Sequence, residues 1–113
     1  MAIYNLEVLK EMSGGDTDFI QQVLTMTLED LPEVITKLEK ANEQEDWDTV
    51  FQVAHKIKPT MQTVGLDSNI WTNLLTINDY AKNKKNLEEL SGLVVEICGA
   101  LKKLVVELNK ELV

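Results

Sequence analysis

Apolar residues recur along the chain at spacings of three and four positions, and strict alternation of apolar and polar residues is rare. Such spacing places apolar side chains on one face of a helix. Only two prolines and five glycines interrupt the pattern, and no repeat, low-complexity tract or linker divides it. The chain is therefore predicted to be all-α, with one domain over residues 1–113.

The first half of the chain predicts a short helix followed by a long one. The short helix covers about Tyr4 to Met12 and ends at Gly14-Gly15, because glycine accepts the left-handed conformation that closes a helix. Asp16 is a candidate N-cap for a helix that reaches about Asn42. Pro32 predicts a kink or break near Asp30. The expected apolar face of this helix consists of Phe19, Val23, Met26, Leu31, Ile35 and Leu38.

Three further helices are expected in the second half. Asp46 can cap a helix over about Trp47 to Val64, which Gly65 ends, and Asp67 or Ser68 starts the next. Asn86 and Glu89 resemble a capping box at the start of a last helix that runs to about Glu111. Short connections between long helices imply antiparallel neighbours. The predicted architecture is an antiparallel up-down four-helix bundle with a short extra N-terminal helix.

Composition narrows the possible functions. The formal charge is −8, and all eleven basic residues are lysine, so we expect no nucleic-acid binding. Charged residues interrupt the most apolar stretch, Leu93 to Leu108, so we expect no membrane insertion. Cys98 is the only cysteine, which is compatible with a reducing cytosol, and we expect a cytoplasmic protein.

A metal-binding bundle is excluded by the histidine count. Carboxylate-bridged bundles take Glu-x-x-His pairs from two helices. His55 is the only histidine, and the residue three positions before it is Gln52. We therefore expect no metal and no cofactor in this domain.

His55 lies at the edge of its predicted helix. At about 100° per residue it falls outside the apolar stripe of Trp47, Val50, Phe51, Ala54, Ile57, Met61 and Val64. Lys58 lies one turn further on, Gln62 two turns further on, and Gln52 and Pro59 share the exposed flank. A solvated surface histidine is the simplest interpretation of such a position. The neighbouring cation and amide favour a second interpretation, in which the histidine has a chemical role.

A neutral imidazole is a nucleophile near pH 7, since the ordinary pKa of histidine is about 6.5. Attack on a phosphoryl group brings negative charge beside the ring. Lys58 could stabilise that charge, and Gln62 could donate a hydrogen bond to it.

The sequence of residues 54–66, AHKIKPTMQTVGL, resembles the signature of histidine-containing phosphotransfer (HPt) domains of bacterial two-component phosphorelays. The family pattern reads Ala-His, any residue, an aliphatic residue, Lys, Gly, then Ser or Thr, and later an aliphatic residue and Gly. These domains are helical bundles of about this length, so the resemblance covers nearly the whole chain. Gly65 matches the last motif glycine, for which we expect a structural role.

The resemblance implies a phosphorelay intermediate. His55 would accept a phosphoryl group from the aspartyl phosphate of a response-regulator receiver domain and pass it to another receiver. Lys58 matches the lysine that steadies the phosphoryl charge. The domain would have no ATP-dependent kinase activity, and the magnesium ion would belong to the receiver. The domain could be free-standing or part of a hybrid sensor histidine kinase.

Two features of the resemblance leave questions open. Pro59 stands where the family has glycine, and it lacks the N–H that would bond to the carbonyl of His55, so we expect a local distortion of the helix there. Receivers in this family dock on an apolar patch around the histidine. Gln52 and Pro59 are candidates for that surface, and Ile3, Leu6 and Leu9 belong either to it or, more in keeping with their spacing, to the core.

The alternative function is a helical adaptor that binds receiver or other signalling domains without phosphotransfer. We expect a monomer in either case, because one bundle accounts for the apolar seam of the last helix.

Overall fold

The computed structural model describes residues 3–112, and these form helices and no strand. The helices are α1 (Glu7–Met12), α2 (Thr17–Glu43), α3 (Trp47–Lys56), α4 (Lys58–Thr63), α5 (Ser68–Asn83) and α6 (Leu87–Asn109). None of those helices is long and apolar enough to span a bilayer. The all-α prediction is confirmed.

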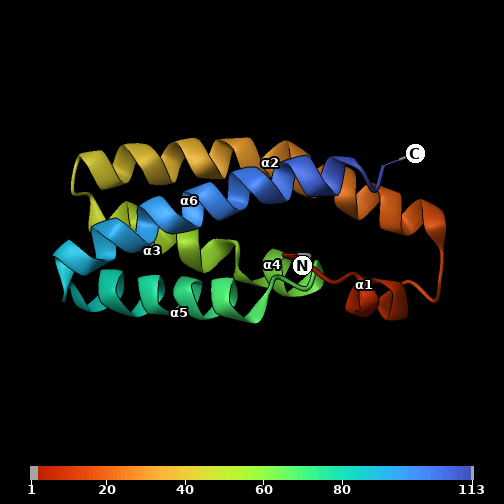
Figure 1. Ribbon diagram of the computed structural model, residues 1–113, viewed down its shortest axis with the longest axis horizontal. Helices are drawn as coiled ribbons and strands as arrows, with labels where there is room; N and C mark the ends of the chain where they lie inside the picture. The colour runs from red at the N-terminus through yellow and green to blue at the C-terminus, as the bar shows by residue number, and fades with distance from the viewer. Residues whose placement is uncertain (1–2, 113) are drawn as a thin grey trace.

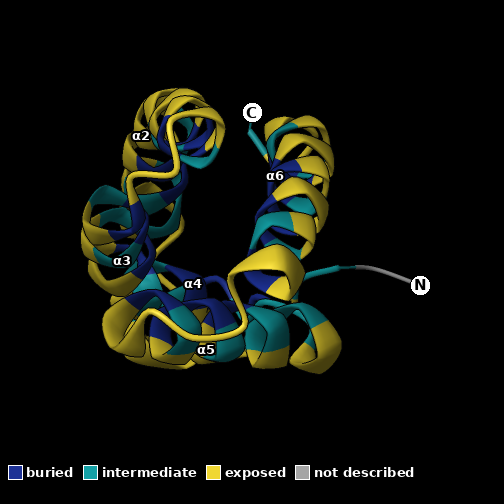
Figure 2. Ribbon diagram, turned by 90° about the vertical axis from the view of Figure 1, so that its left-hand side faces the viewer, coloured by how far each residue is buried: buried dark blue, intermediate teal, exposed yellow. Residues whose placement is uncertain are grey.

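The long helices run side by side along a molecule of 42 × 24 × 21 Å (Figure 1). Helix α2 packs against α3 and α6, and α5 packs against the same two helices on the other side. These four helices therefore surround one core, and α3 and α6 lie on opposite sides of it (Figure 2). This is the predicted up-down four-helix bundle, and α1 is the predicted short extra helix.

Leucines from α2, α5 and α6 fill the centre of the bundle, and Val50, Ala54 and Met61 complete it from α3 and α4. A leucine side chain contributes roughly 1.5–3 kcal/mol when it is fully withdrawn from water. Cys98 is buried among these side chains as a small apolar group. The largest side chains with almost no exposure are Leu9, Leu24, Leu31, Leu38, Met61, Leu74, Ile77, Leu90, Ile97, Leu101, Leu104 and Leu108.

Three of the four predicted N-caps form. The Asp16 carboxylate accepts from the N–H groups of Asp18 and Phe19 at 3.0 and 3.3 Å, and Asp46 and Asp67 cap α3 and α5 in the same way. The predicted capping box at Asn86 is wrong. Asn86 adopts a left-handed conformation (φ 50°), and its side chain makes no capping hydrogen bond. Asparagine tolerates that conformation and here closes the turn instead.

Helix α2 corrects two predictions. It is unbroken across Pro32, and Figure 1 shows a gentle bend in its middle rather than a break. Phe19 and Met26 were placed on its core face, but they are 39% and 64% exposed. The core face is instead formed by Leu24, Thr27, Leu31, Ile35, Leu38 and Ala41. Met26 lies two residues after Leu24, about 200° around the helix, and therefore points away from this stripe.

The single helix predicted for Trp47 to Val64 is two helices. Helix α3 ends at Lys56, Ile57 forms a turn, and α4 begins at Lys58. Pro59 occupies the first turn of α4, where a missing N–H costs no intrahelical hydrogen bond. The distortion expected next to His55 is present, because a proline in the middle of one continuous helix would leave a carbonyl without its donor.

The segment before α1 is held against the turn between α4 and α5. The Asn5 N–H donates to the carbonyl of Gly65 at 2.8 Å, and the Asp67 N–H donates to the carbonyl of Ile3 at 2.8 Å. Gly65 has φ +65°, and a Cβ there would lie 1.8 Å from the Asn5 carbonyl oxygen. The expected structural role of this glycine is to allow the close approach of two backbone segments.

Candidate functional site

His55 lies in the last turn of α3, one residue before the helix ends. Its side chain is exposed, as predicted from its position on the helix. Within residues 3–112, its ring nitrogens take part in no hydrogen bond or ion pair. A nucleophile must offer a free lone pair to its electrophile, and this ring has one available.

Phe51 determines how the imidazole is held. The two rings stack with their centroids 5.4 Å apart and their planes inclined by 23°. Stacking covers one face of the imidazole and leaves its edge, which carries the nitrogens, uncovered. Phe51 is only half-buried and packs against the edge of the core. The apolar pattern assigns Phe51 to the buried stripe of this helix and so does not predict its contact with His55. The four-residue spacing of the two rings is the feature of the sequence that indicates the contact.

Lys58 and Gln62 stand on the other side of the helix break. Lys58 is the first residue of α4 and is half-buried, and Gln62 is exposed one turn later. Among the described residues Lys58 forms no ion pair, so its ammonium is available to an incoming anion. The expected spacing of one and two helical turns from His55 assumed a single helix over residues 47–64, whereas Lys58 and Gln62 belong to the separate helix α4.

Gln52 and Pro59 are both exposed near His55, as predicted. Pro59 also lines an apolar groove of about 310 Å³ between α1, α2 and α4. The groove contains strongly exposed apolar side chains, notably Met12 at 63% and Met26 at 64%. Its lining residues are Leu9, Met12, Phe19, Val23, Met26, Thr27, Asp30, Pro59, Thr60 and Thr63.

The apolar residues of the first helix divide between core and surface. Leu6 and Leu9 are buried, and Ile3 packs against the core, so the core interpretation of these three is correct. Val8 and Met12 are instead the exposed apolar residues of this segment. Sequence reasoning missed the part that Met12, Phe19 and Met26 play in an apolar surface, since it assigned apolar positions at helical spacing to the core.

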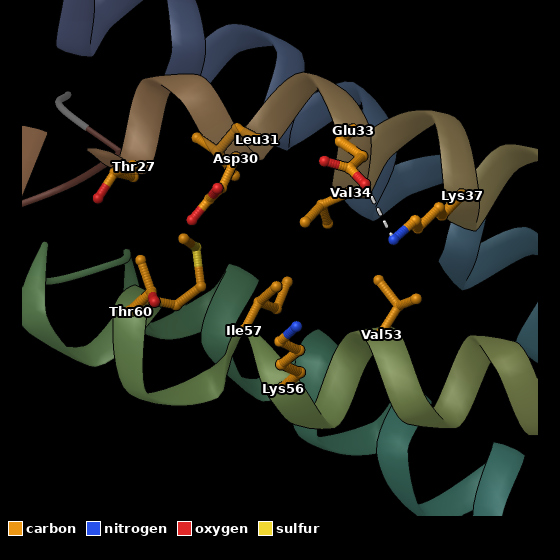
Figure 3. A pocket seen from close by; sticks show the side chains of 11 residues that line it. Thr27, Asp30, Leu31, Glu33, Val34, Lys37, Val53, Lys56, Ile57 and Thr60 are labelled. Carbon is orange, nitrogen blue, oxygen red and sulfur yellow. Dashed lines mark ion pairs between the residues drawn. The ribbon is translucent and has the colours of Figure 1, made fainter. Parts of the chain in front are cut away.

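A second, smaller space of about 170 Å³ lies between α2 and the neighbouring helices α3 and α4 (Figure 3). Lys56 points toward α2 at this space, and Asp30 and Thr60 approach it from its two sides. Lys37 pairs with Glu33 at its rim at 3.1 Å. Ligand pockets commonly measure roughly 300–1,000 Å³, so this space is a small recess beside the site.

Comparisons with known proteins give a family match over part of the chain and a fold match over nearly all of it. The family model described as "Hpt domain" matches residues 22–68, which contain His55, Lys58 and Gln62. No curated protein matches the chain. A solved structure, the HPT domain from the Hpt sensor hybrid histidine kinase from Shewanella, aligns with a TM-score of 0.83 at 20% identity. The alignment covers 96% of this chain and 92% of that one.

The two comparisons agree with each other and with the geometry. The family match runs from within α2 to the first residue of α5 and includes the exposed histidine. The structural match extends the shared fold to the rest of the bundle. Residues 22–68 thus match the family model of Hpt domains, and the bundle as a whole has the fold of a solved HPT domain.

Proposed function

We propose that this phosphotransfer domain of two-component signalling carries a phosphoryl group on His55. The group arrives from the aspartyl phosphate of one receiver domain and leaves to the aspartate of another. Lys58 stabilises the phosphoryl charge, and Gln62 donates a hydrogen bond to it. The domain contributes the nucleophile and the docking surface, while the magnesium ion and the remaining groups belong to the receiver.

The observation that carries the proposal is the state of the His55 ring. It is exposed, it has no hydrogen-bond partner among the described residues, and Phe51 stacks on one of its faces. A solvent-exposed histidine without a chemical role does not need an aromatic ring stacked against it. Stacking limits the orientations of the ring, so less entropy is lost when the ring aligns for attack.

The transfer step is an in-line displacement. The unprotonated ring nitrogen of His55 attacks phosphorus, a P–N bond forms, and the P–O bond to the receiver aspartate breaks. The aspartate leaves as a carboxylate, and the other ring nitrogen keeps its hydrogen. The three phosphoryl oxygens carry negative charge throughout, so the unpaired ammonium of Lys58 favours the transition state.

The apolar groove beside Pro59 is the proposed docking surface for the receiver. Pro59 is four residues from His55, across the turn at Ile57, so a partner seated in the groove would also reach the histidine. Burial of the exposed methionine and phenylalanine side chains would contribute favourable free energy to the binding of a partner. Pro59 presents a rigid apolar ring here, where the family pattern has glycine, so it shapes the contact directly.

Phosphotransfer from a labelled receiver tests the role of His55. We expect the protein to acquire acid-labile, base-stable label from a phosphorylated receiver, and we expect His55→Gln to acquire none. Lys58→Ala should slow the transfer by about 10-fold to 100-fold, since one charge-stabilising contact is lost, while Lys82→Ala, a change of another exposed lysine, should leave it unchanged. Label on a folded His55→Gln protein would refute the assignment.

A binding assay separates the carrier from the adaptor. Met26→Ser should weaken receiver binding by about 10-fold, because one large apolar contact is lost. Val95→Ser is the matched control, since Val95 is also 64% exposed but lies on α6. A wild-type protein that binds several receivers through the groove and takes label from none of them would be an adaptor.

A further inference from the structure

Helix α6 has an outer face that no other part of the described chain covers. Its buried residues all lie toward α2 and α5. Val95 and Val106 on the other side are 64% and 57% exposed. They are eleven residues apart, which is three helical turns, so they share one face. Two exposed valines three turns apart do not form a continuous apolar patch, so the case for a contact surface rests on the glycines and charges of this face.

Gly99 lies at the centre of this face, directly opposite the core side of α6. Gly92 lies two turns before it on the same side, and no atom outside the helix lies within 4 Å of a Cβ built at either glycine. A second helix could therefore approach the α6 backbone closely at both positions. The glycines alone identify no partner, but the charges around them do.

The charges on this face are divided between its two halves. Glu88 and Glu96 precede Gly99, whereas Lys103 and Lys110 follow it, and all four are exposed. Glu96 lies three residues before Gly99, and Lys103 lies four residues after it on the same flank, since seven residues make almost two full turns. Neither side chain forms an ion pair among the described residues. On the other flank Lys102 is already paired with Glu39 of α2 at 3.0 Å.

This division is self-complementary in one orientation. If two copies of α6 cross antiparallel about a two-fold axis near Gly99, Glu96 of each copy lies beside Lys103 of the other. Glu88 then lies near Lys110, which within its own chain is paired with Glu107 at 3.5 Å, so the Glu96–Lys103 pairs carry the complementarity. The same axis places each Val106 against the gap at Gly92 of the partner. In a parallel pair this flank would meet the opposite flank of the partner, so Lys103 would lie beside Lys102 and Glu96 beside Val95, and no opposite charges would meet.

We propose that the outer face of α6 docks on the same face of a second copy of this chain, as an antiparallel two-fold dimer. This proposal differs from the expected monomer, because that expectation rested only on the buried apolar face of α6. A single helix pair lies at the small end of specific interfaces. The dimer therefore dissociates in the range of about 10–100 µM.

The proposed dimer leaves both phosphoacceptor sites open. Helices α3 and α6 are on opposite sides of the bundle (Figure 2), so the partner covers neither His55 nor the groove beside Pro59. Each dimer would present two receiver sites that face away from each other. The inference is independent of the proposed function, because it concerns a different face and needs no phosphate.

Charge exchange in sedimentation equilibrium tests the proposal. The wild type should show a concentration-dependent dimer whose dissociation constant rises with salt. Glu96→Lys alone and Lys103→Glu alone should each raise the dissociation constant about 10-fold, because each places like charges together twice. The double variant should dimerise like the wild type. The two single variants mixed in equal amounts should form a heterodimer, since all contacts between them are then attractive.

The control is Lys82→Glu, which changes an exposed lysine on α5 and should behave like the wild type. Circular dichroism should show that every variant folds, since all the changed side chains are exposed. A wild type that remains monomeric up to about 1 mM would overturn the proposal. So would a dimer that responds equally to Lys82→Glu and Lys103→Glu, or single variants that do not pair with each other.

Discussion

Phe51 and His55 stack with their ring centroids 5.4 Å apart, one turn from each other on α3. The contact holds the imidazole at the surface without using either of its nitrogens. An aromatic pair of this kind contributes about 0.5–1.5 kcal/mol. The exposed imidazole, the proposed nucleophile, is thus held by packing and, within residues 3–112, by no hydrogen bond.

Replacement of Phe51 should slow phosphotransfer without abolishing it. In Phe51→Leu the imidazole loses its stacking partner and samples more orientations, so the transfer rate should fall by about 2-fold to 10-fold. Phe51→Tyr keeps the ring and should transfer at the wild-type rate. Rapid-quench kinetics with a labelled receiver measures both, and equal rates for the leucine and tyrosine variants would contradict a positioning role.

Pro59 should be the cause of the helix break at Ile57. In Pro59→Ala the new N–H can donate to the carbonyl of His55, so residues 47–63 should join into one helix. The ¹³Cα shift of Ile57 should become helical, and the amide of residue 59 should gain protection from exchange.

The matched control for this experiment is Pro32→Ala. Helix α2 already runs without a break through Pro32, so the limits of that helix should not change. An unchanged Ile57 shift in Pro59→Ala would show that tertiary packing, not proline, ends α3.

Gly65→Ala should destabilise the fold much more than Gly14→Ala. Both glycines have a positive φ near 60°, so both substitutions pay the left-handed cost of about 1–2 kcal/mol. A Cβ at residue 65 also collides with the Asn5 backbone, whereas one at residue 14 meets nothing within 4 Å. We expect a total loss of about 2–4 kcal/mol for Gly65→Ala by urea unfolding. Equal losses would show that the N-terminal segment moves away at little cost.

Tyr4 should make the stability of the fold depend on pH in the alkaline range. Its hydroxyl donates a hydrogen bond to the Glu111 carboxylate, and this bond, with partial burial, raises the pKa of Tyr4 from 10.0 to about 12. Because the folded pKa is above the unfolded one, the stabilisation is complete below pH 10 and is lost as the pH rises through 12.

The stability difference between the wild type and Tyr4→Phe should therefore shrink between pH 10 and 12. An absorbance titration in a Tyr80→Phe background reports on Tyr4 alone, since the chain has two tyrosines. A midpoint at the ordinary tyrosine value would contradict the hydrogen bond to Glu111.

Much of the fold could be predicted because it depends on local rules. Helical spacing, aspartates before helices and glycine pairs act within a few residues, so the bundle, the caps at Asp16, Asp46 and Asp67, and the exposure of His55 all followed. The capping box at Asn86 did not form, because its conformation is set by the whole turn between α5 and α6.

The sequence by itself determined which residue is the candidate nucleophile, since there is one histidine and its surrounding motif is specific. Only the tertiary structure decided what surrounds it. Whether Phe51 supports the imidazole or fills the core, and whether Met26 is buried or lines a groove, depends on where the neighbouring helices lie. An apolar residue at helical spacing is driven out of water in either case, but only packing between helices decides whether this chain or a partner covers it.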